Sequence, residues 1–177
     1  LEFAGRSRVS GELALPDSAH YGIYTDIAIG QDTVRIYNIH LQSMSIDEKD
    51  LSDFEGVRNN YTTVFHKLKH GFVNRAGQVD NLVNHLQSSP HPVIVCGDFN
   101  DLPYSYTYFT LRRRLHNAFE RAGNGLGFSY NGRLFFLRID NQFYGDALKA
   151  GSYQTIRNVS YSDHFPVKTH YTFTKNW

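Results

Sequence analysis

The sequence has almost no cysteine, tryptophan or methionine, and no excess of either charge. Cys96 is the only cysteine, which excludes an internal disulfide and a C-x-x-C metal or redox site. Lys plus Arg number 18 against 17 for Asp plus Glu, a formal net charge of +1. This balance gives no long-range attraction to nucleic acid or to an anionic membrane, so an anionic ligand must be held by local groups. We expect Cys96 to be a small buried apolar residue.

Long apolar runs are also lacking. Runs such as Val93–Cys96 and Leu134–Leu137 are far shorter than the roughly 18 residues that a membrane-spanning helix needs. We therefore expect no transmembrane segment in this sequence. The first residues include no initiator Met, no basic stretch and no apolar stretch of a secretion signal. The sequence thus gives no localisation.

What is present is an ordinary globular composition with many aromatic residues. Hydrophobic residues make up 41% and charged residues 20%, which excludes disordered and fibrous classes. There are 12 Tyr and 13 Phe, and aromatic residues favour the surfaces of β-sheets. We expect one domain with substantial strand content.

Apolar patterns predict the elements of the first half. Two alternating runs, Tyr21–Ile29 and Val34–Leu41, flank a turn at Gly30 and predict a β-hairpin. Ser52 and Glu55 form a capping box, after which apolar residues three and four apart predict a long amphipathic helix. Prolines at positions 90 and 92 end it.

The continuous apolar run Val93–Cys96 predicts a strand buried on both faces. A second helix is expected to open at Pro103 and run to about Leu115. Four more strands are expected near residues 127–131, 134–143, 152–159 and 166–173. Helices among these strands predict an α/β fold with mixed sheets.

Asp98 and Asn100 directly follow the predicted buried strand. Alternation places their side chains on one side and Phe99 in the core. The carboxyl ends of buried strands are where α/β proteins bind ligands, and this pair suits an oxygen-preferring cation. Asp and Asn are equally common in Asx turns, so a purely structural turn is the alternative.

Three further positions carry groups able to do chemistry. His40 shares a strand face with Asn38, although a strand histidine is more often a hydrogen-bonded core residue. Asp163 and His164 place a hard metal ligand beside a proton carrier. Asp140 lies in an apolar stretch, where an unpaired carboxylate is costly. We therefore expect Asp140 to hydrogen-bond an imidazole, that of His164 rather than that of His40.

Two other groups of residues are interpreted as structural rather than functional. His66 and His70 are one helical turn apart, but Lys67 and Lys69 between them would repel a cation, which favours a solvated helix face. The run Arg112–Arg114 could contact phosphates, but cations at a helix C-terminus also complement the helix dipole.

Four short motifs in this order resemble the endonuclease/exonuclease/phosphatase superfamily, which includes the DNase I-like nucleases, abasic-site endonucleases, inositol-polyphosphate phosphatases and bacterial sphingomyelinases. The motifs are His40-Leu41, Gly97-Asp98-Phe99-Asn100, Ile139-Asp140 and Ser162-Asp163-His164. The resemblance implies a DNase I-like, four-layered α/β sandwich with two packed mixed β-sheets. It also implies metal-dependent hydrolysis of a phosphate ester, with Mg²⁺ or Mn²⁺ as the cofactor.

The resemblance also implies a role for each residue. His40 would bind or protonate the phosphate, and Asp98 would align or deprotonate the attacking water. Asn100 would hold the phosphate or the metal, and Asp140 would orient His164, which would stabilise developing negative charge. The implied phosphate-binding residues are therefore His40, Asn100 and His164. The implied metal ligands are Asp98, Asn100 and Asp163.

The family's first half normally supplies an Asn and a metal-binding Glu, and this sequence begins too late to hold them. We therefore expect residues 1–177 to be one domain of this kind without its N-terminal part. Such a piece is expected to need a second polypeptide, such as the remaining half, or to self-associate. Little Mg²⁺-dependent phosphodiesterase activity is expected from it alone.

The substrate stays open among nucleic acid, a phosphoinositide and a phospholipid head group, as a phosphodiester or a phosphomonoester. The near-neutral charge argues against a tight duplex-DNA binder. The alternative to an enzyme is a truncated or degenerate module that binds a phosphate ligand or a partner without catalysis.

Overall fold

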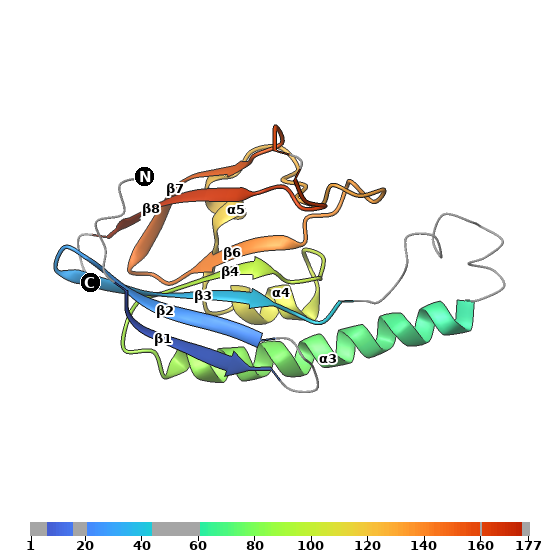
Figure 1. The fold of residues 1–177 in the computed structure, drawn as a ribbon, viewed down its shortest axis with the longest axis horizontal. Coiled ribbons are helices and arrows are strands. Elements are labelled where there is room, and N and C mark those ends of the chain that lie inside the picture. Colours follow the sequence, from blue (N-terminus) through green and yellow to red (C-terminus); the bar gives the residue numbers. More distant parts are fainter. Residues whose placement is uncertain (1–6, 16–20, 44–60, 160, 175–177) are drawn as a thin grey trace.

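A computed structural model describes residues 7–15, 21–43, 61–159 and 161–174. Its main element is a six-stranded sheet with the strand order β1-β2-β3-β4-β6-β5 (Figure 1). The strands are β1 (Ser7–Ala14), β2 (Tyr21–Ile29), β3 (Asp32–His40), β4 (Val93–Asp98), β5 (His116–Asn117) and β6 (Asp140–Tyr144).

Parallel pairing of β3 with β4 decides where the functional residues meet. All other neighbours in this sheet are antiparallel, but β3 and β4 run in the same direction. Their register pairs Arg35 with Val93 at one end and His40 with Asp98 at the other. The ends of both strands therefore lie at the same edge of the sheet.

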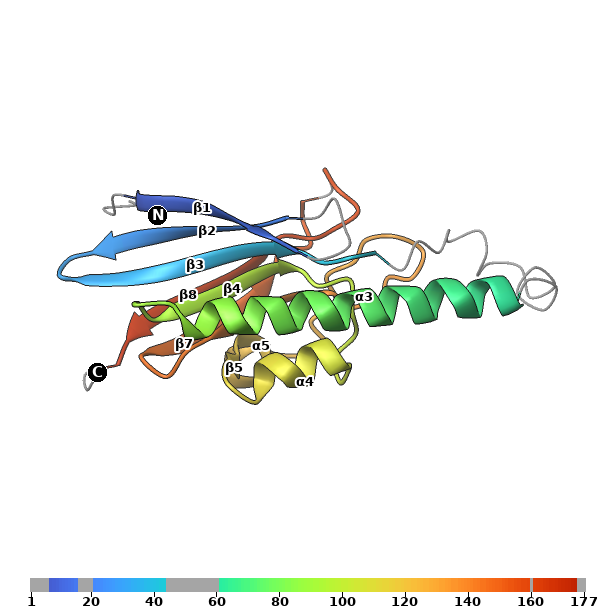
Figure 2. The ribbon, with the colours of Figure 1, turned by 90° about the horizontal axis from the view of Figure 1, so that it is seen from below.

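Helices α3 (Tyr61–Gln87) and α4 (Tyr106–Arg112) pack on one face of this sheet (Figure 2). α3 is a single helix through Gly71 and Gly77. The core between these helices and the sheet is built from Leu and Val of α3, apolar residues of β3 and β4, and aromatic rings. It includes Tyr37, Ile39, Val79, Leu82, Val95, Phe99, Tyr108, Leu111 and Phe143.

A second, antiparallel sheet of β7 (Leu148–Thr155) and β8 (Val167–Phe173) packs on the other face, with the short helix α5 (Ala118–Ala122) against β7. The core on this side comprises Val34, Ile94, Ala118, Tyr144, Leu148, Ala150 and Tyr153. The predicted α/β class with mixed strands is confirmed. No described helix has the length and apolar character needed to span a bilayer.

Several predicted boundaries are confirmed and others are wrong. The hairpin of β2 and β3 and the strand β4 form as expected. The second helix begins at Tyr106 rather than Pro103, because Ser105 Oγ accepts the N–H of Tyr108 and Tyr104 has a φ of 75°, outside the helical region. It ends at Arg112, short of Leu115.

The strands expected in the last third are only partly correct. Residues 127–131 contribute one isolated bridge, between Tyr130 and His164. The strand expected at 134–143 forms only in its second part, as β6, and residues 134–137 form a turn. β7 ends at Thr155, earlier than expected, whereas β8 agrees with its prediction. β1, β5 and α5 were not predicted. The capping box at Ser52 and Glu55 lies outside the described residues.

Candidate active site

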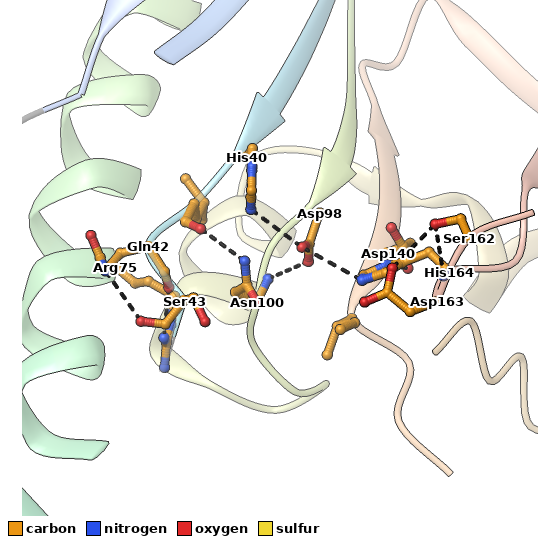
Figure 3. A network of polar contacts seen from close by, with 12 residues as sticks. His40, Gln42, Ser43, Arg75, Asp98, Asn100, Asp140, Ser162, Asp163 and His164 are labelled. Atoms are coloured by element: carbon orange, nitrogen blue, oxygen red, sulfur yellow. Dashed lines mark hydrogen bonds and ion pairs between the residues drawn. The ribbon is translucent and has the colours of Figure 1, made fainter. Parts of the chain in front are cut away.

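Asp98, at the end of β4, is the centre of a polar cluster (Figure 3). Its Oδ1 accepts the backbone N–H of Asn100 at 2.8 Å. Its Oδ2 lies 3.6 Å from Nε2 of His40 and 4.0 Å from Nε2 of His164. One carboxylate thus lies between two imidazoles that are far apart in the sequence.

The turn after β4 has the Asx geometry that was the structural alternative to a ligand site. Asp98 closes an Asx turn by accepting the Asn100 N–H, and Asn100 adopts a positive φ of 48°. The same turn directs Asn100 toward the end of β3, where its Nδ2 donates to the carbonyl of Leu41 at 2.9 Å. The backbone N–H of Leu41 in turn donates to the carbonyl of Asp98 at 3.0 Å.

Asp140 and His164 form the hydrogen bond expected from the sequence. Nδ1 of His164 lies 2.8 Å from Oδ2 of Asp140, which confirms this pairing and its preference over His40. Ser129 supports the pair, because its Oγ accepts the backbone N–H groups of Ile139 and Asp140. Since Nδ1 faces Asp140, the other ring nitrogen faces Asp98.

Burial and neighbouring charges shift two of these groups. Burial raises the pKa of Asp98, and the nearby Asp140 carboxylate raises it further, against the lowering effect of the Asn100 N–H and the two imidazoles. The hydrogen bond to Asp140 raises the pKa of His164, with burial acting in the opposite direction. These shifts make the Asp98 carboxylate more basic and favour the charged form of the His164 imidazole next to it.

The donor set at this edge suits a hard divalent cation. One donor atom each from Asp98, Asp140 and His164 lies within 4.8 Å of the others. Two close carboxylates are oxygen ligands of the kind that Mg²⁺ prefers, and a cation would relieve their mutual repulsion. Among the described residues, no other three acidic, histidine or cysteine residues come as close together.

Asp163 differs from the other predicted site residues. It directly precedes His164, but its side chain is exposed and its Oδ1 accepts the hydroxyl of Ser162 at 3.2 Å. It does not belong to the group formed by Asp98, Asp140 and His164. The predicted metal set of Asp98, Asn100 and Asp163 therefore stays a prediction.

A cavity of about 320 Å³ opens beside this cluster, lined in part by Asn38, Cys96, Asp140 and His164. Cys96 is half-buried, and its thiol donates to the carbonyl of Tyr37. Burial raises the pKa of this thiol to about 11, so it stays protonated at neutral pH and is a poor nucleophile.

The histidines of α3 and the arginines at the end of α4, for which the sequence favours a structural role, do not belong to the cluster around Asp98. His66 and His70 are exposed on α3, and Nδ1 of His70 pairs with Asn74 at 3.3 Å. Arg112 pairs with Glu120 at 2.8 Å. These contacts agree with a solvated helix face and a surface ion pair.

Sequence reasoning missed a second layer of residues behind the site. Arg75 and Gln78 of α3 and Asp101 after β4 are all buried. A signal was available, because Arg75 lies three positions after Phe72 and four before Val79, on the predicted apolar face of the helix. A charged residue in that row requires a buried partner.

Comparisons with known proteins agree with this geometry. The family model described as Endonuclease/Exonuclease/phosphatase family matches residues 40–164, from the last residue of β3 to the histidine that pairs with Asp140. A search of curated protein sequences found no match.

Solved structures of this kind share the fold. The human Nocturnin catalytic domain with bound sulfate has a TM-score of 0.65 at 19% identity, with 98% of this chain and 62% of that chain covered. The mannosyl-6-phosphatase of Bacteroides thetaiotaomicron VPI-5482 has a TM-score of 0.66 at 17% identity, covering 96% and 67%. D. rerio TDP2 complexed with a single-strand DNA product has a TM-score of 0.67 at 13% identity, with 95% of this chain and 68% of that chain covered. The chain thus spans about two thirds of the length of each.

Proposed function

Because the chain belongs to the endonuclease/exonuclease/phosphatase family, we propose that the cluster around Asp98 hydrolyses a phosphate ester with the help of a divalent cation. One observation carries the proposal. His164 is held by Asp140 through Nδ1 at 2.8 Å and presents Nε2 toward Asp98 at 4.0 Å. An oriented imidazole facing a half-buried carboxylate supplies both a proton acceptor and a positive charge.

Hydrolysis forms a bond from a water oxygen to phosphorus and breaks the bond to the ester oxygen. Asp98 is suited to take the proton of the attacking water, since burial and Asp140 raise its pKa. His40 and His164 flank this carboxylate and can donate to phosphoryl oxygens, which become more negative in the transition state. Asp140 orients His164 and favours its charged form. Asn100 would hold the phosphate through its side-chain amide.

The clustered carboxylates of Asp98 and Asp140 are the groups that would hold Mg²⁺ or Mn²⁺, with the charged imidazole of His164 beside them donating to the phosphate rather than to the ion. Asn100 and Asp163 would complete the set that the family resemblance implies. When bound, the cation supplies Lewis-acid polarisation of a phosphoryl oxygen.

The substrate class is left to experiment among a phosphodiester or phosphomonoester of nucleic acid, of a phosphoinositide or of a phospholipid head group. These substrates share the phosphate ester group on which the cluster around Asp98 is proposed to act. Because the chain spans about two thirds of the length of the solved structures that it resembles, a comparison of variants is a sharper test than an absolute rate.

The test compares two Asp–His pairs with similar nitrogen-to-oxygen distances, Asp140–His164 at 2.8 Å and Asp146–His116. Asp146 pairs with His116 at 2.7 Å, and its side chain is 91% exposed. We expect Asp140→Asn to reduce Mn²⁺- or Mg²⁺-dependent hydrolysis of bis-p-nitrophenyl phosphate and of p-nitrophenyl phosphate about 100-fold or more. Asp146→Asn should leave it unchanged.

Binding is measured alongside turnover, by NMR titration of the chain with inorganic phosphate in the presence of Mg²⁺. Phosphate binding that weakens in Asp140→Asn, without turnover in any variant, would support the non-catalytic phosphate-binding alternative. Equal hydrolysis by wild type and Asp140→Asn would contradict the proposed function.

A further inference from the structure

Two short segments carry the residues of the candidate site. The segment after β3 follows His40 with Leu41, Gln42 and Ser43, and the segment after β4 contains Asp98, Asn100 and Asp101. The contact between His40 Nε2 and Asp98 Oδ2 is 3.6 Å, longer than a hydrogen bond. The backbone segments that carry these two side chains therefore help to set their spacing.

Arg75 of α3 contacts both segments: Gln42 after β3, beside which Figure 3 draws it, and Asp101 after β4. Its Nη1 donates to the carbonyl of Gln42 at 2.9 Å, and its Nε lies 3.3 Å from Oδ2 of Asp101. One helical turn later, Oε1 of Gln78 accepts the backbone N–H of Gln42 at 2.9 Å. One face of α3 thus binds both the N–H and the C=O of Gln42 in the segment after β3. Through Asp101, the same face also contacts the segment after β4.

Stability alone is a weak reason for this arrangement. Arg75 and Gln78 are 0% exposed and Asp101 is 4% exposed. Within the described part of the chain, Nε and Nη2 of Arg75 have no hydrogen-bond partner, so the guanidinium is only partly compensated for its burial. Buried ion pairs with incomplete hydrogen bonding stabilise a fold less than well-packed apolar residues of similar volume. Positioning of the site accounts for the feature better.

We propose that Arg75 is a positioning residue for the candidate active site. It fixes the spacing of His40 relative to Asp98 and Asn100 by joining Gln42 to Asp101, and Gln78 assists it through the N–H of Gln42. The inference rests on the proposed function for its consequence in turnover, but the geometric claim stands on the contacts alone.

A buried ion pair at the other end of β3 offers a matched control for the loss of Arg75. Arg35 of β3 forms a short, buried ion pair with Asp26 of β2, at 2.6 Å. It precedes His40 by five residues, which is about 16 Å along the strand. Arg35→Met therefore removes a comparable ion pair from the same sheet at a distance from the site.

The experiment uses Arg75→Met, Arg75→Lys and Arg35→Met, with ¹³C- and ¹⁵N-labelled histidine. We expect Arg75→Met to shift the imidazole signals of His40 and His164 and to weaken inorganic phosphate binding about tenfold. Arg75→Lys retains one charged donor, so its histidine signals and its phosphate affinity should lie between those of the wild type and those of Arg75→Met. Arg35→Met should lower the unfolding midpoint without moving those signals.

Gln78→Met is the second variant, for the case in which Arg75→Met does not fold. It removes the acceptor for the Gln42 N–H and should shift the His40 signal in the same direction. In hydrolysis assays the Arg75 variants should lower kcat more than they raise KM. Site signals that move equally in Arg75→Met and Arg35→Met, or that move in neither, would overturn the positioning role. Absence of turnover in the wild type would instead count against the proposed function.

Discussion

At the scale of single residues, Gly97 shows how closely β3 and β4 approach at the site. It has a φ of 138°, which side-chain-bearing residues rarely adopt, and a Cβ there would collide with the carbonyl of Ile39. We expect Gly97→Ala to destabilise the fold by on the order of 3 kcal/mol and to displace Asp98 from His40. Urea unfolding and the hydrolysis assay measure these two effects.

Gly77 is the control for that substitution. It lies within α3, where a Cβ meets nothing within 4 Å, so Gly77→Ala should stabilise the chain by about 0.5–1 kcal/mol. Equal unfolding free energies for the two alanine variants would contradict the close approach of β4 to Ile39.

Residue-level reasoning predicted one buried pair and missed another. The Asp140–His164 pair followed from the expense of burying a carboxylate, combined with a histidine in a nearby motif. The Arg75–Asp101 pair obeys the same rule, but neither residue lies in one of the short motifs that pointed to the other pair. Only the packing of α3 against the sheet brings them together, and apolar periodicity does not specify which polar residues meet.

At the scale of elements, the ion pair between β2 and β3 makes stability depend on pH. Asp26 is 4% exposed, and its hydrogen bonds to Arg35 lower its pKa below the ordinary value of 3.8. A carboxyl group with a lowered folded-state pKa stabilises the fold above its unfolded-state pKa. That stabilisation is lost as the pH falls through the folded-state value.

We therefore expect Asp26→Asn to lower the free energy of unfolding on the order of 3 kcal/mol at pH 7. The gap between wild type and variant should close as the pH is lowered from about 5 to 2, because the wild type then loses the same interaction. Urea unfolding at several pH values gives both curves. A gap that stays constant down to the lowest pH would show that Asp26 keeps its ordinary pKa.

Elements with strong local signals were predicted well, and those fixed by tertiary contacts were not. The β2–β3 hairpin and β4 carry alternating or continuous apolar residues, so their patterns identify them. β5 has two residues and exists only through its pairing with β6. Residues 134–137 are as apolar as a strand but form a turn, in which the N–H of Leu137 donates to the carbonyl of Leu134.

At the scale of the whole molecule, the two faces of the large sheet are covered unequally. Even-numbered residues of β2 such as Tyr24 face α3, where this ring packs against His85. Odd-numbered residues lie on the opposite face, and there Ile23 and Ile29 are 51% and 50% exposed. Ile27, between them on the same face, packs against the core under the second sheet, so the uncovered part of this face is confined to the two exposed isoleucines.

Exposed isoleucines on a sheet face, next to a two-stranded sheet, favour contact with another chain. We expect the chain to self-associate with rising concentration, and Ile23→Lys together with Ile29→Lys to reduce this, because burying two lysines in a contact is unfavourable. Leu126→Lys is the control, since Leu126 is 68% exposed on a turn away from β2. Sedimentation velocity and light scattering across a concentration series measure the outcome. A wild type that stays monomeric throughout, or an effect of Leu126→Lys as large as that of the double variant, would show that this sheet face is not the contact surface.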